Sequence, residues 1–173
     1  MEGRVLILTG TCGSGKTTVA ELLALRKGWV RVSEDDVWHE QFGRNRGIFG
    51  ASEHRRKRRR VHALVFASVR GAVAIGKSVV IDATVHESPP ASFREYRAFF
   101  GRNHIAWRIC VLHPKLEVAI ARDSARTCWN LGPERVASLH AKFTGTTFPR
   151  DSFLDSSLDT PEDTMARIIV RGA

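Results

Sequence analysis

The sequence predicts an α/β fold built on a central parallel sheet, and three observations support this prediction. Short apolar runs alternate with segments of helical periodicity along the 173 residues. The first apolar run leads through a glycine-rich turn straight into a helical pattern. No internal repeat, low-complexity tract or linker interrupts this alternation. We therefore expect one domain over residues 1–173, large enough to bury a core of its own.

Five apolar runs have the length and composition of buried strands. They are Val5 to Leu8, Trp29 to Val32, Ser78 to Ile81, Ile105 to Leu112 and a weaker run around Phe153. Strands of parallel sheets are apolar on both faces because helices cover both sides. The segments between the runs show helical periodicity, as crossover connections require. We expect a central five-stranded parallel sheet with helices on both faces.

Two helices can be predicted in more detail. The longer one runs from about Ser52 to Ile75, with Ser52 as its N-cap. Its inner stripe is Val61, Leu64, Val65, Ser68, Val69, Ala72 and Val73. Near the end of the chain, Thr160 is the expected N-cap of a helix that has Pro161 at its first position and acidic residues in its first turn.

Residues Gly10 to Thr17 have the spacing G-x-x-x-x-G-K-[ST] of a phosphate-binding loop. Glycines allow the backbone to approach phosphates closely, and the following helix offers them its positive end. Lys16 supplies a charge near the β- and γ-phosphates, and the Thr17 hydroxyl is a ligand for magnesium. The expected nucleotide-binding residues of this motif are Gly13, Ser14, Gly15, Lys16, Thr17 and Thr18. The alternative is a glycine-rich turn that matches by accident, which the flanking strand and helix disfavour.

The composition restricts the class of partner. Twenty-seven Lys and Arg residues against eighteen Asp and Glu residues give a net charge of +9, which favours anionic partners such as nucleotides, nucleic acid or phosphorylated metabolites. Cys12, Cys110 and Cys128 are odd in number and far apart, so neither a disulfide framework nor a zinc site is indicated. No apolar segment is long enough to span a bilayer, and we expect a cytoplasmic protein without a membrane partner.

Carboxylates follow two of the predicted strands. Asp35 and Asp36 come after the second strand, and Asp82 ends the third. The carboxyl ends of parallel strands face the crevice in which doubly wound sheets bind ligands. Asp35 or Asp36 therefore suits a general base or a group that holds magnesium directly or through water, and Asp82 suits the acceptor side or a magnesium ion held through water. The alternative for all three is the capping of a helix or turn.

Arginines follow the fourth predicted strand. Arg122 and Arg126 are four residues apart, which places both on one face of a helix and suits them to grip phosphate oxygens. We expect a lid segment at about residues 122–133 that carries these arginines and keeps water from the phosphate. A solvated helix face is the alternative.

The densest run of charge is His54 to Arg60, near the start of the long helix. Positive charge there opposes the helix dipole, so an anionic partner such as a nucleic-acid backbone would compensate it. Arg58 is the member of this run that we assign to the acceptor. A solubilising surface explains the same run equally well.

With these residues in place, the chain resembles the small P-loop kinases, and among them the kinase domain of phage polynucleotide kinase. The resemblance rests on Gly13 to Thr17, Asp35-Asp36, Ile81 to Thr84 and Arg122 to Arg126, in this order. It implies a P-loop kinase-like fold, with Asp35 as general base, Asp82 in the acceptor site and Arg126 on the donor phosphates. The family usually has an arginine where this chain has Trp38. Kinases of small metabolites and antibiotic phosphotransferases share the overall pattern.

Three functions follow as hypotheses. The first is a kinase that uses ATP and Mg²⁺ to phosphorylate a hydroxyl, preferably the 5′-hydroxyl of single-stranded RNA or DNA ends, with Lys16, Asp35 and Arg126 as catalytic residues. The second keeps this chemistry but takes a sugar, nucleoside or antibiotic as acceptor. The third is a nucleotide-dependent binding module that transfers nothing, which the acids Asp35 and Asp82 disfavour.

Overall fold

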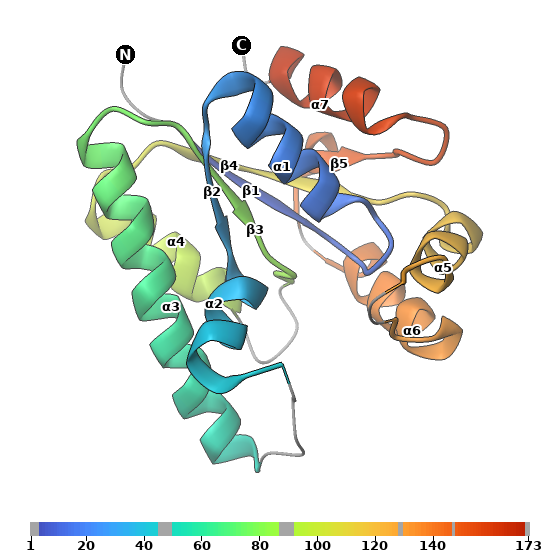
Figure 1. Ribbon diagram of the computed structural model, residues 1–173, viewed down its shortest axis with the longest axis horizontal. Coiled ribbons are helices and arrows are strands. Elements are labelled where there is room, and N and C mark those ends of the chain that lie inside the picture. The colour runs from blue at the N-terminus through green and yellow to red at the C-terminus, as the bar shows by residue number, and fades with distance from the viewer. Residues whose placement is uncertain (1–3, 45–49, 87–91, 128–129, 147, 172–173) are drawn as a thin grey trace.

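A five-stranded parallel sheet forms the centre of the molecule (Figure 1). The computed structural model describes residues 4–44, 50–86, 92–127, 130–146 and 148–171. The strand order is β2-β3-β1-β4-β5. The strands are β1 (Val5–Gly10), β2 (Val30–Ser33), β3 (Val79–Asp82), β4 (Trp107–Leu112) and β5 (Phe153–Leu154). The predicted α/β class and the five predicted strands are thereby confirmed.

Helices cover both faces of this sheet. One apolar core lies between the sheet and helices α1 and α7, and a larger core lies on the opposite face with α3 and α4. Helices α5 and α6 pack on each other to one side of the sheet in Figure 1. The helices are α1 (Lys16–Lys27), α2 (Glu34–Phe42), α3 (Ala51–Ala74), α4 (Ser92–Arg102), α5 (Leu116–Ser124), α6 (Pro133–Thr144) and α7 (Pro161–Val170), with a 3-10 turn at Arg150–Ser152. None of the helices among the described residues has both the length and the apolar composition needed to cross a bilayer.

The register of the sheet brings the carboxyl ends of its strands together. Leu8 of β1 pairs with Asp82 of β3, and Asp82 pairs in turn with Ser33 at the end of β2. On the other side, Gly10 pairs with Leu112 at the end of β4. The turn after β1 and the acidic residues after β2 and β3 therefore lie along one edge of the sheet.

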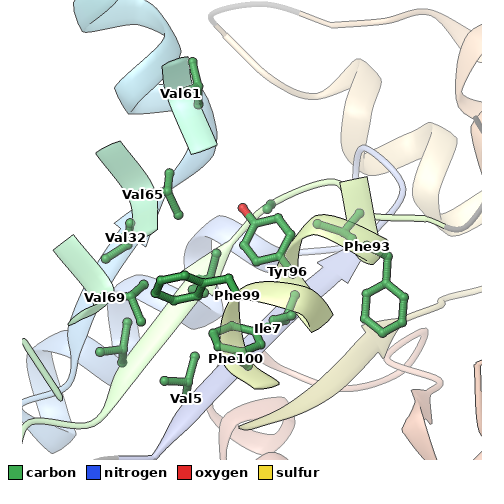
Figure 2. Close-up of a cluster of buried hydrophobic side chains, with 14 of the residues drawn as sticks. Val5, Ile7, Val32, Val61, Val65, Val69, Phe93, Tyr96, Phe99 and Phe100 are labelled. Atoms are coloured by element: carbon green, nitrogen blue, oxygen red, sulfur yellow. The ribbon is translucent and has the colours of Figure 1, made fainter. Parts of the chain in front are cut away.

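The larger core is built from valines of α3 and aromatic residues of α4. Val61, Val65 and Val69 are fully buried and lie beside the aromatic residues of α4 in the same core, on one face of the sheet (Figure 2). The rings of Phe66 and Phe99 stack with their centroids 4.3 Å apart. These contacts fix the long helix α3 against the sheet, and they place its first half beside α2.

The long helix differs from its prediction in two respects. Its N-cap is Gly50, so the prediction that Ser52 caps it was wrong. The predicted inner stripe is only partly correct, because Leu64 is 38% exposed and Ser68 is exposed, whereas His62 is buried. His62 faces α2 and α4, where its imidazole forms hydrogen bonds that a leucine side chain could not form. At the other end of the chain, the predicted N-cap Thr160 is confirmed and forms a capping box with Asp163.

His62 joins three helices inside the larger core. Its Nε2 lies 2.7 Å from Glu34 Oε1 of α2, and its Nδ1 hydrogen-bonds Glu95 of α4. Burial alone lowers the pKa of the imidazole, but the hydrogen bonds and charges of Glu34 and Glu95 outweigh burial, and the pKa of His62 is raised above its ordinary value. Tyr96 of α4 and Arg58, one turn earlier on α3, are the other titratable groups near this cluster.

Replacement of His62 by Gln is expected to destabilise the protein in a pH-dependent manner. A raised pKa in the folded state means that the protonated imidazole stabilises the fold fully below its unfolded pKa of about 6.5 and less as the pH rises through the folded value. The difference in unfolding free energy between wild type and His62→Gln should be about 2 kcal/mol at pH 6 and should decrease above pH 6.5. Urea denaturation from pH 5.5 to 9 measures it. The exposed His104, replaced by Asn, is the control, and a pH-independent difference for His62→Gln would contradict the expectation.

Candidate active site

The loop between β1 and α1 needs its glycines for conformation and for space. Gly10, Gly13 and Gly15 all have positive φ values, of 145°, 75° and 93°. A Cβ atom on Gly13 would lie 2.0 Å from the carbonyl oxygen of Ala119, and one on Gly10 would lie 2.2 Å from that of Leu112. The loop is therefore held tightly between the end of β4 and helix α5.

Polar groups of this loop are placed where they could bind an anionic ligand. Lys16 is buried, and its Nζ donates to the carbonyl oxygen of Thr11, 2.9 Å away. Ser14 is only 1% exposed, and its Oγ has no hydrogen-bond partner within the described part of the chain. A buried hydroxyl without a partner is costly, and a phosphate oxygen would satisfy it. The residues of the loop thus fit the phosphates of a nucleotide, with Thr17 and Thr18 exposed at the start of α1.

A pocket of about 290 Å³ adjoins the loop. Three parts of the chain line it: the loop with the start of α1, the end of α5, and the connection from β5 to α7. Gly13, Thr18, Arg122, Arg126, Ser156 and Asp159 are among its lining residues. A pocket of this size beside a phosphate loop suits the nucleoside part of a nucleotide.

Both predicted lid arginines lie at this pocket, but they do not share a helix face. Helix α5 ends at Ser124, so Arg122 belongs to its last turn and Arg126 lies beyond it. Arg122 Nη2 donates to the carbonyl oxygen of Ser156 at 3.0 Å. Arg126 Nη1 lies 3.8 Å from Oδ1 of the buried Asp123. The geometry predicted for the pair was wrong, although the pocket brings the two guanidinium groups together; residues 128 and 129 of the predicted lid lie outside the described residues.

The acidic residues after β2 form the first turn of α2. They are Glu34, Asp35 and Asp36, and the N-cap before them is Ser33, whose Oγ accepts a hydrogen bond from the Asp36 N–H at 3.1 Å. A serine therefore caps the helix, and neither aspartate does. Their negative charges lie where a helix N-terminus stabilises them.

Arg31 of β2 joins the two sets of predicted carboxylates. Its Nη1 lies 2.7 Å from Asp36 Oδ2, and its Nη2 lies 3.2 Å from Oδ2 of Asp82, which is 6% exposed. Burial lowers the pKa of Arg31, but the two carboxylates outweigh this effect and raise it. Asp82 and Asp36 are thus held in ion pairs with Arg31, and Asp35 and Asp36 are both exposed.

The Cys12 thiol shows that charged groups from separate segments converge on the phosphate loop. Burial raises the pKa of Cys12, the cations Lys16 and Arg126 lower it, and the anions Asp123 and Asp35 raise it. All four charges therefore act at one point of the loop. The structure brings the predicted base, the lysine of the motif and the lid arginine to the same edge of the sheet.

A magnesium ion would depend on the phosphates for most of its ligands. In the ranges that the structure describes, no three His, Cys, Asp or Glu residues are grouped so that they could hold a metal. The Thr17 hydroxyl is exposed at the start of α1, and Asp35 and Asp82 lie at the same sheet edge. These residues fit a magnesium ion that is bound mainly by phosphate oxygens and water.

The basic run on α3 has two kinds of members. Some hold α2 and α3 together: Lys57 pairs with Glu53 at 3.1 Å and lies over the Phe42 ring, and Arg60 donates to Gln41 at 2.9 Å. Others point to solvent, namely Arg55, Arg56 and Arg59. Arg58 is half-buried, and its charge acts on Tyr96 together with those of Glu34 and Glu95. Arg58 belongs to α3 and is not among the residues that line the pocket beside the phosphate loop.

Trp38 and Arg31 show what the sequence patterns did not reveal. Trp38 is buried and packs on Phe42 with ring centroids 5.2 Å apart, so it is a core residue between α2 and α3. Arg31 was missed as a site residue because it stands inside an apolar run. The available signal was its type, since a cation in a buried strand needs an anionic partner.

Solved structures with the same fold include three proteins with different functions. A chain of the Pnkp1/Rnl/Hen1 RNA repair complex is 25% identical with a TM-score of 0.64, covering 82% of this chain and 44% of that one. A sugar kinase from Janibacter sp. HTCC2649 is 21% identical, with a TM-score of 0.69 and coverage of 97% and 93%. The tunicamycin resistance protein of Deinococcus radiodurans is 14% identical, with a TM-score of 0.74 and coverage of 99% and 96%. The chain thus spans less than half the length of the RNA repair protein, and the other two likenesses show the fold alone.

The search of curated protein sequences gives no match. A family model described as an AAA domain matches residues 5–143, from β1 to the last turn of α6. The matched region contains the phosphate loop, the acidic residues at the ends of β2 and β3, and the arginines Arg122 and Arg126. Because this match covers well over half of the chain, the protein belongs to the AAA domain family and has the α/β fold of a P-loop kinase.

Proposed function

We propose that the protein is a kinase that uses ATP and Mg²⁺ to phosphorylate a hydroxyl group. The observation that carries this proposal is the geometry of the site: the phosphate loop and Arg126 line one pocket, Lys16 begins the helix that follows the loop, and Asp35 lies just beyond the end of β2 on the same edge of the sheet. Phosphoryl transfer needs cations on the phosphates and a carboxylate near the attacking hydroxyl. The fold supports the same conclusion, since a sugar kinase shares it over nearly the whole chain.

The donor side consists of the loop, the start of α1, and Arg122 and Arg126 at the end of α5 and just beyond it. Lys16 and the loop amides bind the phosphates, and Arg126 is close enough to the loop to stabilise the charge that develops on the transferred group. Thr17 would be the protein ligand of a magnesium ion that neutralises phosphate charge, and Asp35 or Asp82 would hold the ion through water. The adjoining pocket takes the nucleoside.

The acceptor side begins at the first turn of α2. The hydroxyl oxygen of the acceptor attacks the γ-phosphorus, the bond from that phosphorus to the bridging oxygen of ADP breaks, and the hydroxyl proton passes to the Asp35 carboxylate. Asp35 suits this role because it is exposed at the crevice. Asp82, paired with Arg31, orients the acceptor.

We favour the 5′-hydroxyl of a polynucleotide as the acceptor. Arg55, Arg56 and Arg59 form an exposed basic surface on α3, the helix against which α2 packs. Such a surface binds a nucleic-acid backbone, and Arg58 would contribute from its edge. The similarity to a protein of an RNA repair complex and the resemblance to phage polynucleotide kinase support this choice.

A small-molecule acceptor is the second candidate. The sugar kinase is matched over 93% of its length, whereas the RNA repair protein is matched over less than half. The position of the arginine typical of polynucleotide kinases is occupied by the buried Trp38. A sugar, nucleoside or antibiotic would then enter the crevice beside Asp35, and the basic surface of α3 would be dispensable.

Substitution of Lys16 or Asp35 tests the chemistry. We expect Lys16→Ala to lower turnover by about 100-fold or more, since the lysine stabilises transferring charge. Asp35→Asn should lower kcat by about 10²- to 10⁴-fold and leave the Kd of ATP within about twofold, because a general base acts in the chemical step. Glu40→Gln, which changes an exposed carboxylate of the same helix, is the control. Near-normal turnover of Asp35→Asn would remove that residue from the role of base.

A panel of acceptors identifies the substrate class. Radiolabelled ATP is incubated with single-stranded and duplex oligonucleotides bearing 5′-hydroxyls, gluconate, ribose, nucleosides and aminoglycosides, and the labelled product is identified. We expect labelled oligonucleotides, with an acceptor affinity that falls with salt at a log–log slope of about −0.7 per phosphate contact.

Charge removal on α3 provides an independent check on this result. The triple variant Arg55→Gln, Arg56→Gln, Arg59→Gln should raise the KM for the oligonucleotide. It should also make the log–log dependence of acceptor affinity on salt shallower, by the amount expected for the loss of about two to three phosphate contacts. Arg70→Gln, an exposed arginine near the other end of α3, should change neither. Label on a small molecule alone, with the triple variant fully active, would establish the second candidate.

A further inference from the structure

We propose that His62 and Arg31 are positioning residues that clamp the first turn of α2 from two sides and thereby fix the direction of Asp35. The inference rests on the proposed function, in which Asp35 accepts the proton of the attacking hydroxyl. It adds two residues to that mechanism, one from helix α3 and one from strand β2. Neither belongs to the phosphate loop or to the segment after α5.

Three successive carboxylates form this turn, and the outer two are bonded to cations from different elements. Glu34 accepts a hydrogen bond from His62 Nε2 at 2.7 Å, and Asp36 accepts one from Arg31 Nη1, also at 2.7 Å. Successive residues of an α-helix are about 100° apart around its axis, so Glu34 and Asp36 point in different directions. The two bonds therefore fix the rotation of the turn about its axis, and Asp35 lies between them.

The His62 side of the clamp is set into the core. The imidazole is 2% exposed, and its ring centroid lies 5.6 Å from that of Phe66 and 5.3 Å from that of Tyr96. Both ring nitrogens face carboxylates, Glu34 of α2 and Glu95 of α4, and both can donate only when the ring is protonated. Glu34 is thus bonded to a buried imidazole that Glu95 of α4 holds from the other side.

The Arg31 side of the clamp is set into the sheet. Arg31 stands in β2, and its guanidinium also holds Asp82 at the end of β3 at 3.2 Å. The planar group bonds both carboxylates through separate nitrogens, so the position of Asp36 is fixed relative to two strands. Asp36 is bound a second time through its backbone N–H, which donates to Ser33 Oγ.

Stability alone does not account for these ion pairs. The Asp36 side chain is 56% exposed, and ion pairs of that kind contribute about 0–1 kcal/mol. The desolvation of a buried pair such as His62–Glu34 offsets much of its attraction. Such bonds are well suited to fixing the position of the helix turn that carries Asp35. A catalytic group must be held within about 0.5 Å of its productive place, and a displacement of about 1 Å costs on the order of 100-fold in rate.

The rest of α2 is attached by other contacts. Trp38 packs against Phe42 and His54 in the core, and Gln41 accepts a hydrogen bond from Arg60 of α3. These contacts hold the helix in place but lie one to two turns away from Asp35. Loss of the clamp should therefore change the orientation of the Asp35 side chain while α2 stays packed against α3.

The first test separates turnover from binding. On the acceptor that the panel labels, His62→Gln and Arg31→Gln are expected to lower kcat by about 10- to 100-fold, with the KM for ATP within about twofold. Glu34→Gln and Asp36→Asn remove the other partner of each bond and should have the same effect, so a folding failure of one variant does not decide the result. Gln41→Ala breaks an α2–α3 contact away from the turn and should keep wild-type kcat.

A double-mutant cycle gives the decisive test. If the clamp acts through Asp35, neither His62→Gln nor Asp36→Asn, which leaves the pair of Arg31 with Asp82 in place, should lower kcat further when it is added to Asp35→Asn. A merely structural role would lower kcat by the same factor in both backgrounds, and that additivity would overturn the proposal. Wild-type kcat in folded clamp variants, with Asp35→Asn inactive, would also overturn it while leaving the proposed function intact. Full activity of Asp35→Asn would instead disprove the assignment of the base.

Discussion

The close approach of the phosphate loop to helix α5 is the constraint on which the donor site depends. Gly13 lies so near the carbonyl oxygen of Ala119 that a single added carbon would collide with it. This contact places the end of α5, with Arg122 and the following Arg126, beside the loop. The glycine thus has two functions: its positive φ shapes the phosphate turn, and its missing side chain lets the arginines reach the nucleotide.

A second constraint governs the acceptor side, where cations act inside the protein. The chain has a large excess of positive charge, and much of it could be taken for surface. Arg31 and His62 do not belong to the surface: they are half-buried and buried, and they bind the carboxylates around Asp35. The basic run on α3 is divided in the same way, because Lys57 and Arg60 hold α2 while Arg55 and Arg59 face solvent.

The donor and acceptor sides of the site also differ in how well the similar proteins support them. The family model and the solved structures agree on the phosphate loop and on the sheet that carries it. The functions of the similar structures diverge, from RNA repair to a sugar kinase to antibiotic resistance. This divergence is reasonable, because kinases of one fold share the donor phosphates, whereas their acceptors differ in chemistry.

The sequence by itself determined the parts that depend on local physics. The five strands, the cap at Thr160 and the phosphate loop follow from apolar runs, from hydrogen bonds within a few residues, and from the needs of a glycine turn. Only the tertiary structure decided which partner each charge finds. His62 was not expected in the core, Ser52 was expected to cap a helix that Gly50 begins, and Arg31 was not recognised. Pairs such as Arg31 and Asp82, 51 residues apart, have no local pattern, since their energy depends on burial and distance that exist only once the sheet has formed.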